Sequence, residues 1–314
     1  MSYRISRHPE ERTGVAGTRL EGRTPPAPHP WGWQFIDLAG LGRNTGRSYA
    51  AVLLRIVLYP LGLTLLAELA YAIAIFFQPW QAVRPAISIV EQFGAVAIAG
   101  VALVRSVPRY HQRPWLSLVA PDLRIDWRRV AIGCGAELAI VLGQLALIHA
   151  RTGWPWRLAL PAALPLVALT LLLIPLQAAS EEILFRGYLT QALGRVIGRR
   201  VPIVLIVALV FGLLHVNAYG PLTLPYFFVL SLVLSLVSLR DDRLELAIGG
   251  HSAMNLLAVA TASFSPLVPG VVGLGDAAMQ FNLWAIVALI VHGALFYGLT
   301  RLLVRVFCKP RSPV

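Results

Sequence analysis

The sequence predicts an all-α, polytopic integral membrane protein with about eight transmembrane helices and both termini in the cytoplasm. Of its 314 residues, 57% are hydrophobic and only 13% are charged, whereas soluble domains carry roughly 25% charged residues. Several apolar runs approach the roughly 20 residues that a helix needs to cross a bilayer. Eight such runs use well over half of the chain and leave little for a soluble domain.

The apolar runs place the expected helices along most of the chain after a polar start. We expect helices at about 52–77, 85–104, 130–150, from 160 onward, 201–218, 222–239, 245–264 and 283–304. The first fifty residues are polar and rich in arginine and proline, without the early apolar region of a signal peptide. We therefore interpret residues 1–50 as a disordered cytoplasmic tail.

The distribution of basic residues predicts the orientation of the helices. The chain has 27 Lys and Arg residues and a net charge of +12, and Lys309 is the only lysine. With eight spans, 19 of these residues lie near the membrane on the side of the N-terminus, and only Arg84, Arg151 and Arg157 lie on the other side. Because arginine collects in cytoplasmic loops, the basic excess indicates a bacterial inner (cytoplasmic) membrane and contact with lipid. It does not indicate binding to nucleic acid.

Two adjacent carboxylates, Glu181 and Glu182, follow a long apolar run. Ionisable side chains inside a membrane are costly, so each one is a candidate functional residue. On a helix, Glu182 and Arg186 are four residues apart and share a face, so they can form an ion pair. Glu181 points about 100° away from Glu182. We therefore expect one carboxylate to be held by an arginine and its neighbour to act in chemistry.

Two later helices carry further polar side chains in apolar surroundings. His215 lies four residues after Phe211 in the fifth expected helix. His251 and Asn255 are four residues apart in the seventh, so they share one helical face. Two polar side chains on one face of an apolar helix need a polar partner or a hydrated cavity.

The turn expected at 194–200 relates these clusters in space. If it joins two antiparallel helices, residues at equal distances from its midpoint lie level with one another. Glu181 and His215 lie on either side of Gly198, and each is about 25 Å along its helix from that residue at 1.5 Å per residue. His251 enters from a helix that begins on the same cytoplasmic side. We predict that helix four continues to about residue 193 and that three helices meet around a buried polar pocket.

The three clusters resemble the motifs of the CAAX prenyl protease-like family of intramembrane endopeptidases, also called the CPBP or Abi family. That family carries EExxxR, FxxxH and HxxxN or a similar pattern on successive core helices. Every motif position is matched here in order: Glu181, Glu182 and Arg186; Phe211 and His215; His251 and Asn255. The resemblance covers about residues 160–265.

With this resemblance, the chain divides into four expected parts. They are a basic, proline-rich tail at 1–50, N-terminal transmembrane helices at 51–155, a CPBP-like catalytic core at 156–265, and a last transmembrane helix with a basic cytoplasmic tail at 266–314.

The resemblance implies hydrolysis of a peptide bond in a membrane-associated protein or peptide. In that scheme Glu181, assisted by His215, is the general base that activates water. His251 and Asn255 stabilise the oxyanion. Glu182 is counted among the catalytic residues, and Arg186 and Phe211 support the site. A carboxylate in a low-dielectric cavity has a raised proton affinity, which makes it a better base near neutral pH.

The resemblance leaves the role of a metal open. Glu181, His215 and His251 could supply a zinc site with one carboxylate, two imidazoles and an open water position. However, no HExxH helix is present to place two histidines on one face. We therefore favour a metal-free glutamate protease, with a zinc metalloprotease as the alternative, and no cofactor is firmly implied.

Two other classes of function compete with the protease. A non-catalytic scaffold or an immunity protein against a peptide toxin would need the pocket residues only for folding. A proton-coupled transporter would use further intramembrane carboxylates, such as Glu68, Glu91 and Glu137, as a proton relay. The sequence shows no internal repeat of the kind common in transporters.

Overall fold

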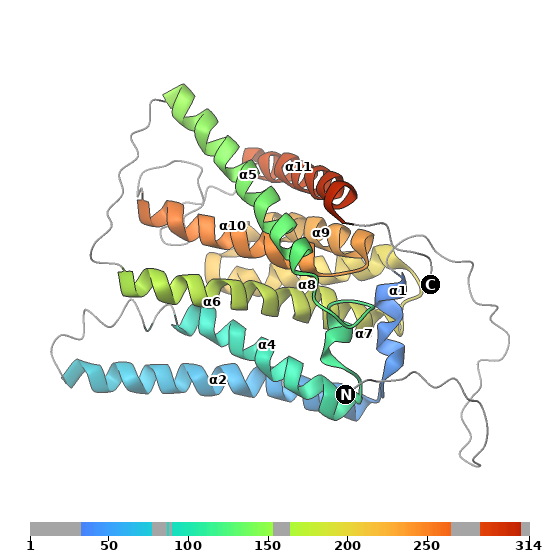
Figure 1. The fold of residues 1–314 in the computed structure, drawn as a ribbon. Helices are drawn as coiled ribbons and strands as arrows, with labels where there is room; N and C mark the ends of the chain where they lie inside the picture. The colour runs from blue at the N-terminus through green and yellow to red at the C-terminus, as the bar shows by residue number, and fades with distance from the viewer. Residues whose placement is uncertain (1–32, 77–86, 88–89, 153–163, 265–282, 309–314) are drawn as a thin grey trace, which may run out of the picture. The chain divides into compact units, whose positions relative to one another are not determined.

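The computed structural model describes residues 33–76, 87, 90–152, 164–264 and 283–308, and these residues form helices without any β-strand (Figure 1). The described residues of all eight predicted segments are helical, so the all-α prediction is confirmed. Residues 77, 85–86, 88–89 and 160–163 of those segments lie outside the described residues. The α-helices are α1 (Trp33–Ile36), α2 (Gly46–Phe76), α4 (Ala95–Ser106), α5 (Trp127–Thr152), α6 (Leu164–Glu182), α7 (Thr190–Gly194), α8 (Arg200–Tyr219), α9 (Leu224–Asp241), α10 (Glu245–Phe264) and α11 (Leu283–Phe307).

Six helical stretches of the described chain are long and apolar enough to cross a membrane. They are Gly46–Ile73, Val90–His111, Trp127–Arg151, Ala168–Gly194, Pro221–Asp241 and Ala285–Phe307. Arg200–Val216 is apolar but shorter. Leucines such as Leu65 and Leu66 on α2 are exposed, as expected for a helix that faces lipid rather than water. The polytopic membrane character is confirmed, while the count of eight spans and the orientation stay predictions.

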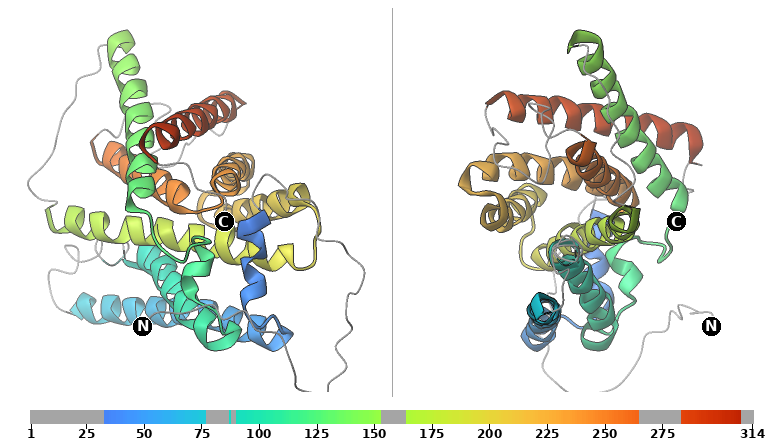
Figure 2. Two further views of the ribbon diagram at one scale, coloured as in Figure 1. Left: turned by 45° about the vertical axis from the view of Figure 1, so that its right-hand side comes forward. Right: turned by 90° about the vertical axis from the view of Figure 1, so that its left-hand side faces the viewer.

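The helices that carry the polar clusters are neighbours in space. α6 packs against α4 and α10, and α10 also packs against α5 and α9. In Figures 1 and 2, α2 and α4 lie on one side of α6, whereas α5 and α11 lie on the other. The packing of α6 against α10 therefore brings the two glutamates to the helix that carries His251 and Asn255.

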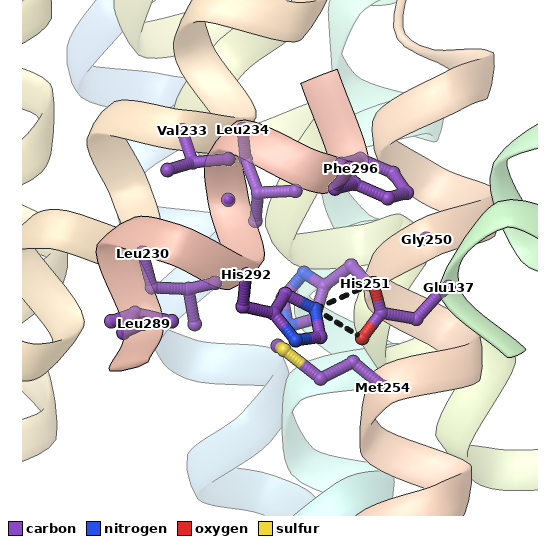
Figure 3. Close-up of a pocket in the computed structure, with 11 residues that line it drawn as sticks. Glu137, Leu230, Val233, Leu234, Gly250, His251, Met254, Leu289, His292 and Phe296 are labelled. Carbon is purple, nitrogen blue, oxygen red and sulfur yellow. Dashed lines mark hydrogen bonds and ion pairs between the residues drawn. The ribbon is translucent and has the colours of Figure 1, made fainter. Parts of the chain in front are cut away.

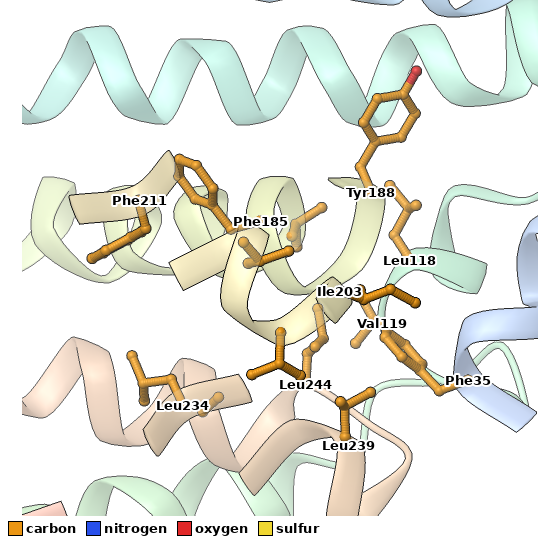
Figure 4. Packing of buried hydrophobic residues seen from close by; sticks show 14 of the residues in the cluster. Phe35, Leu118, Val119, Phe185, Tyr188, Ile203, Phe211, Leu234, Leu239 and Leu244 are labelled. Carbon is orange, nitrogen blue, oxygen red and sulfur yellow. The ribbon is translucent and has the colours of Figure 1, made fainter. Parts of the chain in front are cut away.

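The fourth predicted helix continues beyond the two glutamates, as expected. α6 runs on through a π-helical segment (η6, Ile183–Leu189) into α7, which ends at Gly194, and α8 begins at Arg200. The turn predicted at 194–200 is therefore confirmed. Phe185 and Phe211, from the two arms of this hairpin, meet edge to face with ring centroids 5.1 Å apart (Figure 4).

The predicted disordered tail at 1–50 differs from the structure over residues 33–50, which are mostly helical. Phe35 and Ile36 have exposed fractions of 0% and 1% and belong to the main hydrophobic core. Figure 4 shows Phe35 close to the buried core residue Ile203. Burial of two large apolar side chains offsets the cost of ordering this segment.

Two glycines allow α5 and α10 to approach closely. A Cβ atom at Gly133 would overlap the backbone carbonyl oxygen of Leu246, and one at Gly249 would overlap the carbonyl oxygen of Val130. Small residues at such crossings let helix backbones pack tightly in membranes. Because His251 is two residues after Gly249, this crossing sets the position of a candidate catalytic side chain.

Replacing Gly133 by alanine should destabilise the protein, because the new methyl group meets the backbone of α10. Overpacking of this kind costs about 1–3 kcal/mol. Gly135, on the same helix, has open space where a Cβ atom would lie, so Gly135→Ala should gain about 0.5–1 kcal/mol of helix stability. Thermal unfolding in detergent measures both variants, and equal unfolding temperatures would contradict the close crossing.

Candidate active site

Glu182 is the centre of a buried ionic network between α6 and α10. Its side chain is fully buried, and its Oε1 atom accepts a hydrogen bond of 3.0 Å from Arg186 Nη1. The same Oε1 atom accepts a hydrogen bond of 2.7 Å from His251 Nδ1. The predicted pairing of Glu182 with Arg186 is thus present. A buried charge needs such partners, because its transfer from water is otherwise very costly.

Glu181 points to the other nitrogen of the same histidine. His251 Nε2 lies 3.5 Å from Glu181 Oε2, which is too far for a strong hydrogen bond. Glu181 Oε2 is buried and accepts no hydrogen bond from the described residues. Buried polar atoms are satisfied in nearly all proteins. This oxygen is therefore suited to receive a hydrogen bond from a water molecule or a substrate.

His215 is held in one tautomer by the helix that carries it. Its Nδ1 lies 2.7 Å from the carbonyl oxygen of Phe211, and because a carbonyl only accepts, Nδ1 carries the proton. Nε2 is then the acceptor nitrogen of a neutral ring. The ring stacks on Phe227 of α9, with centroids 4.0 Å apart and planes inclined by 24°. The ring of Phe211, which contacts His215, lies 6.4 Å from the ring of His251.

Phe211 packs between the supporting arginine and the histidine of its own helix. The guanidinium carbon of Arg186 lies 4.5 Å from the centre of the Phe211 ring, a cation–π distance. The same ring lies 4.4 Å from the ring of His215. Phe211 therefore links the position of Arg186 to that of His215 without a polar contact.

Asn255 faces α6 together with His251, as the shared helical face requires. Its Nδ2 atom donates a hydrogen bond of 3.0 Å to Gln177 Oε1. Sequence reasoning missed Gln177, although it is a polar residue in an apolar run and lies four positions before Glu181. That spacing puts Gln177 one helical turn from the glutamate and on the same face.

The zinc set considered from the sequence does not fit this arrangement. Among the described residues, no group of three or more His, Cys, Asp or Glu side chains is arranged to hold a metal ion. The Nδ1 bonds of His251 to Glu182 and of His215 to a backbone carbonyl leave each Nε2 available and do not by themselves exclude a ligand role; the misfit is that the donors do not converge on one point. We therefore route no chemical step through a metal.

Arg243 anchors the N-terminal end of α10, eight residues before His251. It donates hydrogen bonds of 2.7 Å to both Asp122 and Glu245 and one of 2.6 Å to the carbonyl oxygen of Arg124. Burial lowers the pKa of Arg243, but its hydrogen bonds to Glu245 and Asp122 outweigh that effect and raise it. These contacts tie the loop before α5 to the start of α10 and so restrict how far His251 can move.

Comparison with known proteins supports the resemblance inferred from the motifs. Residues 161–257 match the family described as type II CAAX prenyl endopeptidase Rce1-like. The chain is 29% identical over 168 residues to the uncharacterized protein YyaK of Bacillus subtilis (strain 168), and the match covers 51% of this chain and 56% of YyaK. No solved structure matches the chain. The resemblance to the CAAX prenyl protease-like family is therefore confirmed.

The two adjacent glutamates should differ sharply in their effect on stability. Glu182→Gln removes the charge that compensates buried Arg186, and breaking a buried ion pair costs about 3–5 kcal/mol. Glu181→Gln is isosteric and breaks no hydrogen bond at Oε2 to the described residues, so the protein should unfold at nearly the wild-type temperature. Thermal unfolding of the two variants in detergent makes the comparison. A similar loss of stability in both would show that Glu182 is not the structural partner.

Proposed function

From the match of residues 161–257 to type II CAAX prenyl endopeptidases, we propose that the protein is an intramembrane endopeptidase. It hydrolyses a peptide bond in a membrane-associated protein or peptide. The observation that carries the proposal is the buried Glu181 Oε2 atom, which lies beside His251 Nε2 and accepts no hydrogen bond from the described residues. A water molecule that donates to this oxygen would be held among three motif residues.

Water activation in this proposal uses two acceptors. Glu181 accepts one proton of the water, and Nε2 of His215 accepts a hydrogen bond from the other. The water oxygen then attacks the carbonyl carbon of the scissile peptide, and Glu181 becomes protonated. Positioned proton transfer of this kind contributes roughly 10²–10⁴-fold to rate. When the C–N bond of the tetrahedral intermediate breaks, the proton passes from Glu181 to the leaving nitrogen.

The oxyanion of the intermediate needs donors that are in place before the reaction. Asn255 has a second N–H beside the one that it donates to Gln177. His251 donates from Nδ1 to Glu182, so a second donor at Nε2 requires a ring that carries both protons. We assign these two groups to the oxyanion, as the family resemblance implies.

Glu182 and Arg186 act as positioning residues in this mechanism. Glu182 orients His251 through Nδ1, in the way that a buried carboxylate orients the histidine of a hydrolytic triad. Arg186 pairs with Glu182 inside the protein and compensates its charge. The same arginine contacts the face of Phe211, so the network also restrains the hairpin arm that carries His215.

The bilayer and a membrane-associated substrate are the partners that this proposal requires. The arginine bias of the sequence supports a multi-pass protein of a bacterial inner membrane with both termini in the cytoplasm. The proposal requires no prenyl group on the substrate.

Glu181→Gln should abolish cleavage while the protein remains folded, because the amide cannot accept the proton of water. The matched control is Glu68→Gln, which changes an exposed glutamate of another membrane helix, α2, whose main packing partner is α4. Quantitative proteomics of membrane-associated peptides compares strains that carry either variant with the wild type. Cleavage products that vanish only with Glu181→Gln support the protease. An unchanged set of products in that strain would favour a non-catalytic scaffold or immunity protein.

Purified wild-type protein should stay active after treatment with a chelator and contain less than one equivalent of metal per chain. The reason is that Glu181, His215 and His251 do not present three donors to one point. Elemental analysis together with a cleavage assay measures both properties. One tightly bound zinc per chain, lost with activity in His215→Ala and restored by zinc in stripped wild type, would establish the metalloenzyme instead.

A further inference from the structure

A second polar site lies on the side of α10 opposite to α6. A cavity between α5, α9, α10 and α11 is lined by Glu137, His251 and His292, and its other walls are mainly apolar (Figure 3). Leu230 and Leu234 of α9 and Met254 of α10 are among these apolar residues. Glu137 and His292 belong to helices outside residues 161–257, the part of the chain that matches the family, whereas His251 lies inside it.

The Glu137–His292 pair joins two helices with a defined proton arrangement. Gln144 Nε2 lies 3.3 Å from His292 Nδ1, and because the amide nitrogen only donates, Nδ1 acts as the acceptor. Nε2 of His292 therefore carries the proton, and its distances to the two carboxylate oxygens of Glu137 are 2.9 and 3.0 Å. One N–H is thus shared by both oxygens of the carboxylate.

The carboxylate of Glu137 has more capacity to accept hydrogen bonds than this pair uses. An ionised carboxylate offers about four lone-pair sites, and the Glu137 side chain is buried. Inside a membrane protein an under-satisfied carboxylate is costly unless further donors approach it. The adjoining cavity is large enough for a water molecule, so water can supply those donors.

His251 connects this cavity to the proposed catalytic glutamates. It lines the cavity together with Glu137 and His292, while its ring nitrogens lie 2.7 Å from Glu182 and 3.5 Å from Glu181. Hydrolysis consumes one water molecule for each peptide bond, and a site enclosed by membrane helices needs a local source of it. The His251 imidazole therefore lines the cavity and also borders the site beside Glu181 where water would react.

We propose that the cavity is a water-binding site, held by Glu137 and His292, that replenishes the water consumed beside Glu181. This proposal rests on the proposed protease function. Glu137 and His292 are positioning residues in it, because they touch the stored water and not the substrate. No covalent step is involved, since water is only bound and passed to the catalytic carboxylate.

Hydroxyl-radical footprinting by pulsed radiolysis tests the water site without any substrate. Radicals formed from bound water oxidise the nearest sulfur, and Met254 lines the cavity beside His251 and His292 (Figure 3). Met254 should be oxidised in the wild type and several-fold less in the Glu137→Leu, His292→Leu double variant. Glu137→Gln keeps a polar group at the cavity and should retain the oxidation. Unoxidised Met254 in wild type, or equal oxidation in the double variant, would overturn the water site.

Kinetics on a substrate identified through the Glu181→Gln comparison tests the supply of water. The double leucine variant should lower kcat several-fold with KM unchanged, and Glu137→Gln should restore kcat. Circular dichroism and thermal unfolding check that the variants are folded. An unchanged kcat in a folded double variant would overturn the supply role. Because the footprint of Met254 needs no cleavage, failure of the protease proposal and failure of the water site give different results.

Discussion

The structure depends above all on the need to compensate one buried carboxylate, that of Glu182. This side chain has no exposed surface, and a single oxygen accepts hydrogen bonds from Arg186 on its own helix and from His251 on α10. The desolvation of these charges is offset only when all of them are in place. The ion pair therefore adds little net stability as a whole, but it strongly disfavours any register of α6 and α10 that separates its members.

That register gives two neighbouring glutamates different chemistry. Glu182 is held by two strong donors at Oε1, whereas Glu181 Oε2 lies 3.5 Å from the second nitrogen of His251 and accepts no hydrogen bond from the described residues. The histidine also forms part of the wall of the cavity that contains Glu137 and His292. A single imidazole thus lies between a structural carboxylate, a proposed reactive carboxylate and a proposed water store. The close contact between α5 and α10 at their glycines restricts the backbone that carries it.

Local periodicity in the sequence predicted the contacts that lie within one helix or one hairpin. The spacing of four residues predicted the pairing of Glu182 with Arg186, and the midpoint of the hairpin predicted how far the helix of α6, η6 and α7 extends. This reasoning also predicted that three helices meet around a polar pocket, but it could not identify the individual bonds between helices distant in sequence. The bond from Asn255 to Gln177 and the pairing of Glu137 with His292 depend on how helices rotate about their axes. The packing of Phe35 into the core was missed because the surrounding tail is polar.

Nitrogen-15 NMR of the His251 ring, assigned by comparison with a His251→Gln variant, tests the central claim most directly. The orientation of this ring by Glu182 requires a proton on Nδ1 in a strong hydrogen bond to a carboxylate. The predicted spectrum therefore has a protonated Nδ1 whose proton resonates at low field, as in N–H···carboxylate bonds. An unprotonated Nδ1, with the proton on Nε2 alone, would contradict the claim, because Glu182 would then not hold the histidine toward Glu181.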